Sequence, residues 1–198
     1  VSSHDGLYLL MEGAEASTPS PWGLLSGAGL DERLQQLGDI IPDLADWPGR
    51  LVTSTPLPFY LSLHNGQLTL FATDEPRWAG IAVDFLAGAM AHRSRQPVGG
   101  ELVVKAVWGR WKGALSVLDA TAGLGRDGYL LAASGAQVVS CERHPAVALL
   151  LADGLWRARQ AEAENPALNA ILDRWSFRNA SSVALMAELA PDVIYLDP

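Results

Sequence analysis

The stretch that decides the fold is VLDATAGLGRDGYLL, residues 117–131. An apolar run ends in an acid, Asp119, and a helical pattern begins a few residues later. Across this junction Gly123, Gly125 and Gly128 spell G-x-G-x-x-G. Glycines after a strand let the backbone approach a ligand, and the helix start adds free N–H groups and a positive dipole end. Such a turn suits a pyrophosphate and a carboxylate equally, so the glycine spacing by itself leaves the ligand open.

Strand and helix patterns alternate downstream of Leu115. Strands are predicted over 115–120, 136–142, 175–180 and 192–197, with helical segments between them. Strands that alternate with helices at this spacing predict a parallel sheet with right-handed crossovers. The fold class expected for this half of the chain is therefore α/β and Rossmann-like.

The residues before this region follow a different pattern. FYLSLHNGQLTLF, residues 59–71, alternates apolar and polar residues around Asn65-Gly66. This pattern predicts a β-hairpin with a two-residue turn. We expect residues 1–112 to form a small N-terminal α+β domain with a basic connector, and residues 113–198 to form the ligand-binding domain.

Composition narrows the classes of function. The 198 residues carry a net charge of −8, which argues against non-specific nucleic-acid binding. Residues 92–112 hold five bases against one acid, so specific binding stays open. No apolar run approaches the roughly 18 residues of a membrane span, and the lone Cys141 fits a reducing cytoplasm. We expect a cytoplasmic protein with no membrane segment and no metal site.

Two acids bear on the ligand of the glycine turn. Asp119, at the end of the first strand, would repel a pyrophosphate but attract an ammonium group. S-adenosylmethionine has an ammonium and a carboxylate at one end and an adenosine at the other, which fits an acid before the glycines and a helix start after them. The alternative is that Asp119 only caps the turn. Glu142, at the end of the second strand, is expected to accept hydrogen bonds from ribose hydroxyls; its alternative is an ion pair with Arg143.

The fourth predicted strand ends in Asp197-Pro198, where a parallel strand meets the ligand crevice. Side-chain and backbone oxygens there can accept the hydrogens of an exocyclic amine and point its lone pair at a methyl donor. Methyl transfer then depends chiefly on alignment and on acceptors that polarise a weak amine nucleophile in the transition state. Alone, Asp-Pro is a common turn starter. At this place in the fold it indicates methyl transfer to an amine.

With these residues, the chain resembles a bacterial family, the small-subunit ribosomal RNA guanine-N2 methyltransferases of the J type. The resemblance covers roughly residues 55 to 198 and is carried by AGIAVDFLAGAMAHR, LDATAGLGRDGYLLAASGAQV, ERHPAVALLLADGL, NASSVAL and VIYLDP. It implies a class I (Rossmann-like) fold, S-adenosylmethionine (SAM) as donor, and methyl transfer to N2 of one guanosine in 16S rRNA. It also implies cofactor contacts at Arg126, Asp127, Glu142, Arg143, Ser181, Ser182 and Asp197.

Two features qualify this resemblance. Ser181 and Ser182 follow the third strand, where a hydroxyl or backbone group would accept from the adenine amine; Ser182 serves equally well as a helix cap. The family continues past Asp-Pro with Met-Phe-Pro, whose Phe would stack on a flipped guanine. This sequence stops before that Phe, and we expect the later strands of the class I fold to lie outside it too.

The expected partner is 16S rRNA or the small ribosomal subunit. His92, Arg93 and Arg95 are candidates for contact with RNA phosphates, which supply affinity and register; the alternative is a solvated connector. Three other functions stay open. They are an amine methyltransferase acting on DNA adenine or a protein amide, an NAD-dependent oxidoreductase using the G-x-G-x-x-G turn, and a non-catalytic SAM-binding or ribosome-assembly module.

Overall fold

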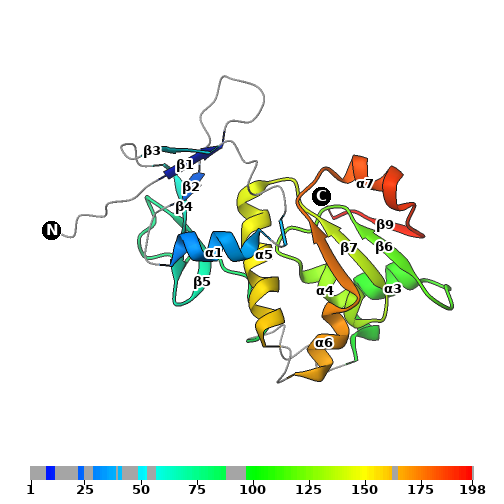
Figure 1. Ribbon diagram of the computed structural model, residues 1–198. Coiled ribbons are helices and arrows are strands. Elements are labelled where there is room, and N and C mark those ends of the chain that lie inside the picture. Colours follow the sequence, from blue (N-terminus) through cyan, green and yellow to red (C-terminus); the bar gives the residue numbers. More distant parts are fainter. Residues whose placement is uncertain are drawn as a thin grey trace. The chain divides into compact units, whose positions relative to one another are not determined.

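The computed structural model describes residues 8–11, 22–24, 29–38, 40–41, 49–52, 57–87, 97–161 and 165–197. Contacts group the chain into two compact units, Val1–Val83 and Asp84–Pro198 (Figure 1). This division lies before the boundary expected between residues 112 and 113, because α3 (Leu102–Trp108) packs on a helix of the second unit. The domain boundary expected from the sequence stays a prediction.

The first unit contains two small sheets and a helix. β1 (Tyr8–Met11) pairs antiparallel with β3 (Gly49–Val52). β4 (Phe59–His64) and β5 (Gln67–Ala72) form an antiparallel pair, and β2 (Trp22–Leu24) joins β4 in parallel. The helix, α1, spans Leu30–Leu37.

The hairpin predicted around Asn65-Gly66 is confirmed. It joins β4 to β5, and its two turn residues have φ of 49° and 76°. A type I′ turn needs positive φ at both positions, which Asn and Gly tolerate best. The turn sets the register of the two strands, so that Leu61 and Leu68 are both fully buried.

The second unit is built on a four-stranded parallel sheet. Its strands are β6 (Ser116–Asp119), β7 (Gln137–Cys141), β8 (Trp175–Arg178) and β9 (Val193–Tyr195). They lie in the order β8-β7-β6-β9, and every neighbouring pair is parallel. The chain moves outward from β6 to β8 and then returns to β9 on the other side of β6. Ligands of open parallel sheets bind at such a switch point, beside the carboxyl ends of the strands.

Helices cover both faces of this sheet (Figure 1). α3, α4 (Arg126–Ala133), α5 (Pro145–Gln160) and α6 (Pro166–Leu172) lie on one side, and a 3₁₀ turn over Val98–Gly100 precedes them. α7 (Ser182–Leu189) lies on the other side. The predicted α/β, Rossmann-like architecture is confirmed. Among the described residues, no helix combines the length and the apolar character that crossing a membrane requires.

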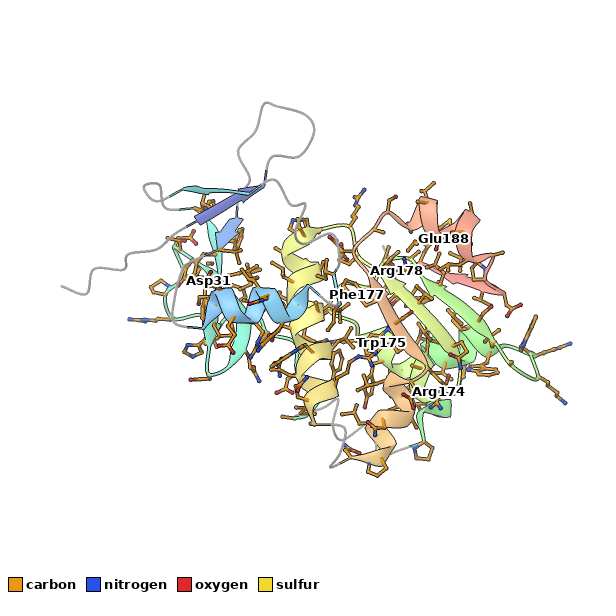
Figure 2. The ribbon with its side chains drawn as sticks, in the orientation of Figure 1. Asp31, Arg174, Trp175, Phe177, Arg178 and Glu188 are labelled. Carbon is orange, nitrogen blue, oxygen red and sulfur yellow. The ribbon has the colours of Figure 1, made fainter. Side chains whose placement is uncertain are left out.

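The side of the sheet that faces α7 is apolar. Leu118 and Cys141 point to this side and pack against Leu185 of α7. Figure 2 shows Arg178, at the end of β8, beside Glu188 of α7, and their charged groups are 4.0 Å apart. Burial, followed by the charges of nearby acids, raises the pKa of the Cys141 thiol to about 11. Cys141 is therefore a core residue.

An ion-pair network ties the first residues of the second unit to α5. Arg157 of α5 donates its Nε–H to Asp153 Oδ2 at 2.9 Å, and its guanidinium lies 3.6 Å from Asp84 Oδ1. Asp153 is fully buried, so Arg157 supplies the charge that a buried carboxylate needs. Phe85 follows and stacks on Tyr129 of α4, with ring centroids 5.4 Å apart.

Candidate functional site

The glycine turn after β6 is held by the strands on both sides of it. The N–H of Ala120 donates to the carbonyl of Tyr195 on β9, and the N–H of Ala122 donates to the carbonyl of Cys141 on β7. At Gly123 the chain takes a φ of 51°, and a Cβ built there would have no atom within 4 Å. The turn therefore presents bare backbone to open space at the switch point, as a ligand-binding turn requires.

The other two glycines serve packing. Gly125 caps α4 at a φ of 77°, and a Cβ there would lie 2.5 Å from Leu151 and 3.0 Å from Trp175. A Cβ on Gly128 would collide with the hydroxyl of Ser140 and lie 3.0 Å from Trp175 Nε1. These contacts explain the three-glycine spacing. The first glycine opens the turn, and the other two let α4 approach the sheet.

Asp119 lies beneath the turn, in a buried hydrogen-bonded chain. Its side chain is 1 % exposed. The Ser140 hydroxyl donates to Asp119 Oδ2 at 2.7 Å, and the indole N–H of Trp175, labelled on β8 in Figure 2, donates to that hydroxyl at 2.9 Å. Asp119 Oδ1 is buried, and no atom of the described residues partners it with hydrogen-bond geometry. The chain therefore satisfies one carboxylate oxygen and leaves the other for a further donor.

The electrostatics of Asp119 reflect this burial. Burial raises its pKa from 3.8 to about 6, against the lowering effect of the Ser140 hydroxyl and the Thr121 backbone N–H. The charges of Asp127 and Glu142 raise the pKa further. The site therefore holds a carboxylate that the protein alone does not fully stabilise.

Glu142 links the turn to the end of β7. Its Oε2 accepts from the Gly123 N–H at 3.1 Å and its Oε1 accepts from the His144 N–H at 2.7 Å. Asn179 donates its side-chain amide to the Glu142 carbonyl at 2.7 Å, which brings in the end of β8. The Glu142 side chain is half-buried, and each of its oxygens has a lone pair beyond the bond given above.

The end of β9 completes the site. The phenol of Tyr195 donates to Asp127 Oδ2 at 2.7 Å, and the N–H of Asp197 donates to the Thr121 hydroxyl at 2.8 Å. Burial and the bond to Asp127 raise the pKa of Tyr195, and the charges of Asp197 and Asp119 raise it further. Asp127 and Glu142 thus act on the titration of Asp119, and Asp127, Asp197 and Asp119 act on that of Tyr195. No group of His, Cys, Asp or Glu suited to a metal occurs within the described ranges.

A family model described as "Putative SAM-dependent methyltransferase" matches residues 48–198. The chain belongs to this family. Its fold agrees, because the crystal structure of the SAM-dependent methyltransferase NGO1261 from Neisseria gonorrhoeae matches 88 % of this chain and 68 % of that one, with a TM-score of 0.64 at 32 % identity.

Curated relatives of this chain carry a more specific name. "Ribosomal RNA small subunit methyltransferase J" of Shewanella sp. (strain ANA-3) is 42 % identical over 167 residues, which cover 83 % of this chain and 62 % of the relative. The protein of the same name from Pseudoalteromonas translucida (strain TAC 125) is 46 % identical over 142 residues, covering 71 % and 56 %. The chain thus spans about 62 % of the length of a curated relative that it matches, and the J-type resemblance read from the sequence is confirmed.

The methyltransferase fold brings most of the expected site residues to one edge of the sheet. Asp119, Gly123, Gly125, Asp127, Glu142 and Asp197 gather around the turn through the bonds given above. Arg126, at the start of α4, and Arg143, after β7, are both exposed. Ser181 takes the N-cap position of α7 without a side-chain capping bond, and Ser182 is the first helical residue.

Four expected residues lie outside the described part of the chain: His92, Arg93, Arg95 and Pro198. The contribution of Ser140, Trp175, Thr121 and Tyr195 was missed in the sequence. The period-two alternation of a strand places Tyr195 on the same side as Asp197, which was the available signal for that residue. The ligand roles of all these side chains stay predictions.

Proposed function

We propose that the protein transfers a methyl group from SAM to the exocyclic N2 amine of a guanosine in small-subunit rRNA. The names of the curated relatives support the substrate, and the family supports the donor. The observation that carries the proposal is the charge of the site. Asp119, Asp127, Glu142 and Asp197 surround an open glycine turn.

This charge discriminates between the two cofactors that the glycine spacing allows. SAM has a sulfonium and an ammonium group against one carboxylate, whereas NAD presents a doubly anionic diphosphate. Acids at short range attract the first and repel the second. Asp119 adds a specific reason, because its buried, unpartnered Oδ1 is stabilised when a cationic donor reaches it. The residues present therefore fit SAM, which when bound supplies an electrophilic methyl group.

The chain's own residues divide the remaining work. The start of α4, which follows the glycine turn, offers N–H groups and a positive dipole end to a ligand carboxylate. Glu142 accepts from ribose hydroxyls with the lone pairs that its two backbone bonds leave free. Ser181 and Ser182, beyond β8, face the adenine end. Asp197, exposed at the end of β9, accepts the hydrogens of the target amine and orients its lone pair.

RNA binding is assigned to the basic connector. His92, Arg93 and Arg95 are proposed to contact phosphates, which would fix the register of the RNA and leave base choice to the crevice. We propose 16S rRNA or the small ribosomal subunit as partner and the cytoplasm as the place of action. Pro198 would restrain the backbone next to Asp197.

Thermal shift and methyl transfer test this proposal together. S-adenosylhomocysteine at a hundredfold excess over its Kd should stabilise the protein by about 2.7 kcal/mol, and NADH should not. Tritiated SAM should label small subunits or 16S rRNA from a strain that lacks the endogenous activity, with N2-methylguanosine in the digest, and DNA should remain unlabelled. Protection by NADH alone would overturn the cofactor, and labelled DNA with unlabelled rRNA would overturn the substrate.

A further inference from the structure

Three hydrogen bonds tie the end of β9 to the glycine turn and α4. The backbone N–H of Ala120 donates to the Tyr195 carbonyl at 2.9 Å. The Tyr195 phenol donates to Asp127 Oδ2 at 2.7 Å. The N–H of Asp197 donates to the Thr121 hydroxyl at 2.8 Å. One element, β9, is therefore held by the turn and by the first turn of α4 at once.

The two side-chain bonds matter because the strand ladder stops before Asp197. The parallel register between β6 and β9 ends where Asp119 pairs with Tyr195. Past this point the residues leave the sheet, and Leu196 is 57 % exposed. The position of Asp197 thus depends on the bond from its own N–H to Thr121 and on the contacts that hold Tyr195, two residues before it.

Tyr195 is suited to this task. Its side chain points to the α4 side of the sheet, where it reaches Asp127. The bond occupies one oxygen of Asp127 and so restrains the rotation of that carboxylate. The Tyr195 phenol therefore restrains Asp127, which the family resemblance implies in cofactor binding. It also restrains the chain segment that carries Asp197, the proposed acceptor for the amine.

We propose that Tyr195 is a positioning residue for methyl transfer, which holds Asp197 in register with the cofactor turn through its bond to Asp127, assisted by the Thr121 hydroxyl. The proposal rests on the proposed function, in which Asp197 orients the amine. Burial and three neighbouring carboxylates keep the phenol protonated. Tyr195 therefore acts as a hydrogen-bond donor and takes no proton from the substrate.

The test removes the hydroxyl and keeps the ring. Tyr195→Phe should lower kcat about 10- to 100-fold, the range expected when one hydrogen bond to a charged group is lost. The KM for RNA should stay close to that of the wild type. Tyr60→Phe is the matched control, because Tyr60 lies in the first unit and stacks on Phe71 at 5.4 Å.

Thr121 gives a second, independent arm. Thr121→Val removes the acceptor for the Asp197 N–H with little change in size, and Thr121→Ser keeps it. We expect Val to lower kcat and Ser to restore most of it. Because Tyr195 and Thr121 act through the same residue, the double variant should lose less than the product of the two single losses.

The outcomes separate the two proposals. Wild-type kcat in Tyr195→Phe, or an equal loss in Tyr60→Phe, would overturn the positioning role while leaving rRNA methylation in place. If the wild type methylates no RNA, the proposed function fails, and hydrogen exchange at the Asp197 amide then decides the role of Tyr195. Exchange should accelerate in Tyr195→Phe and in Thr121→Val; unchanged exchange in Tyr195→Phe would overturn the inference.

Discussion

Replacing Asp119 by Asn removes a charge from the floor of the site and preserves the side chain's size. The carboxylate is 1 % exposed, and burial raises its pKa from 3.8 to about 6. Between these two pH values the folded chain holds a proton that the unfolded chain has released. The free energy of unfolding therefore falls as the pH rises through this window. A shift of about two units corresponds to a loss of about 3 kcal/mol once Asp119 is fully ionised.

The Asn variant has no such titration. The free energy of unfolding of Asp119→Asn minus that of the wild type should therefore increase by about 3 kcal/mol between pH 4 and pH 8. Groups that do not interact with Asp119 titrate alike in both proteins and cancel in this difference. Urea unfolding at each pH measures it. In melting temperature the same change amounts to roughly 6–12 °C for a chain of this size.

Asp192→Asn is the control with the opposite sign. Asp192 is exposed and accepts from the hydroxyl and the backbone N–H of Ser116, and these bonds lower its pKa. Its replacement should therefore lose stability relative to the wild type as the pH rises. If the difference for Asp119→Asn is flat or falls between pH 4 and pH 8, burial does not raise the free energy of the ionised Asp119 carboxylate.

Three further outcomes follow from the same contacts. Calorimetric affinity of the wild type for S-adenosylhomocysteine should fall as the pH drops below about 6, because protonation of Asp119 removes a charge that attracts the ligand; a constant affinity would argue against that attraction. Gly128→Ala should lower stability by ~1–3 kcal/mol through overpacking, whereas Gly99→Ala, with no atom within 4 Å of the new Cβ, should leave the melting curve unchanged. Arg157→Met should cost ~3–5 kcal/mol in denaturant unfolding because it removes the positive charge 2.9 Å from the buried Asp153 carboxylate; a smaller loss would mean that Asp153 becomes protonated or solvated.

The parts of the site that follow from local pattern were predictable. Alternation of strands and helices after Leu115 gives the parallel sheet, and the sheet order then brings the ends of β6 and β9 together. Asn65-Gly66 forms the predicted hairpin because its requirement for positive φ is local. The glycine turn also lies where it was predicted, because the positive φ of Gly123 and Gly125 is likewise a local requirement.

The remainder depends on contacts between distant segments. The sequence predicts that Asp119 lies at the end of the first strand, beside the ligand. In the structure its carboxylate accepts from Ser140 of β7, whose hydroxyl accepts in turn from Trp175 of β8. No sequence pattern near Asp119 predicts either of these contacts. The predicted strand over 192–197 contains Tyr195 but does not indicate its acceptor, because Asp127 lies on a helix that precedes it by two strands.

Cys141 has a practical consequence for experiments on this protein. It is the single cysteine of the sequence, it is 1 % exposed, and its thiol is deprotonated only well above neutral pH. Maleimide reagents react with accessible thiolates, so the native chain should resist them. One cysteine introduced at an exposed position such as Ser181 would then accept a fluorophore site-selectively, and its emission would report occupancy of the crevice without any need to mutate the core.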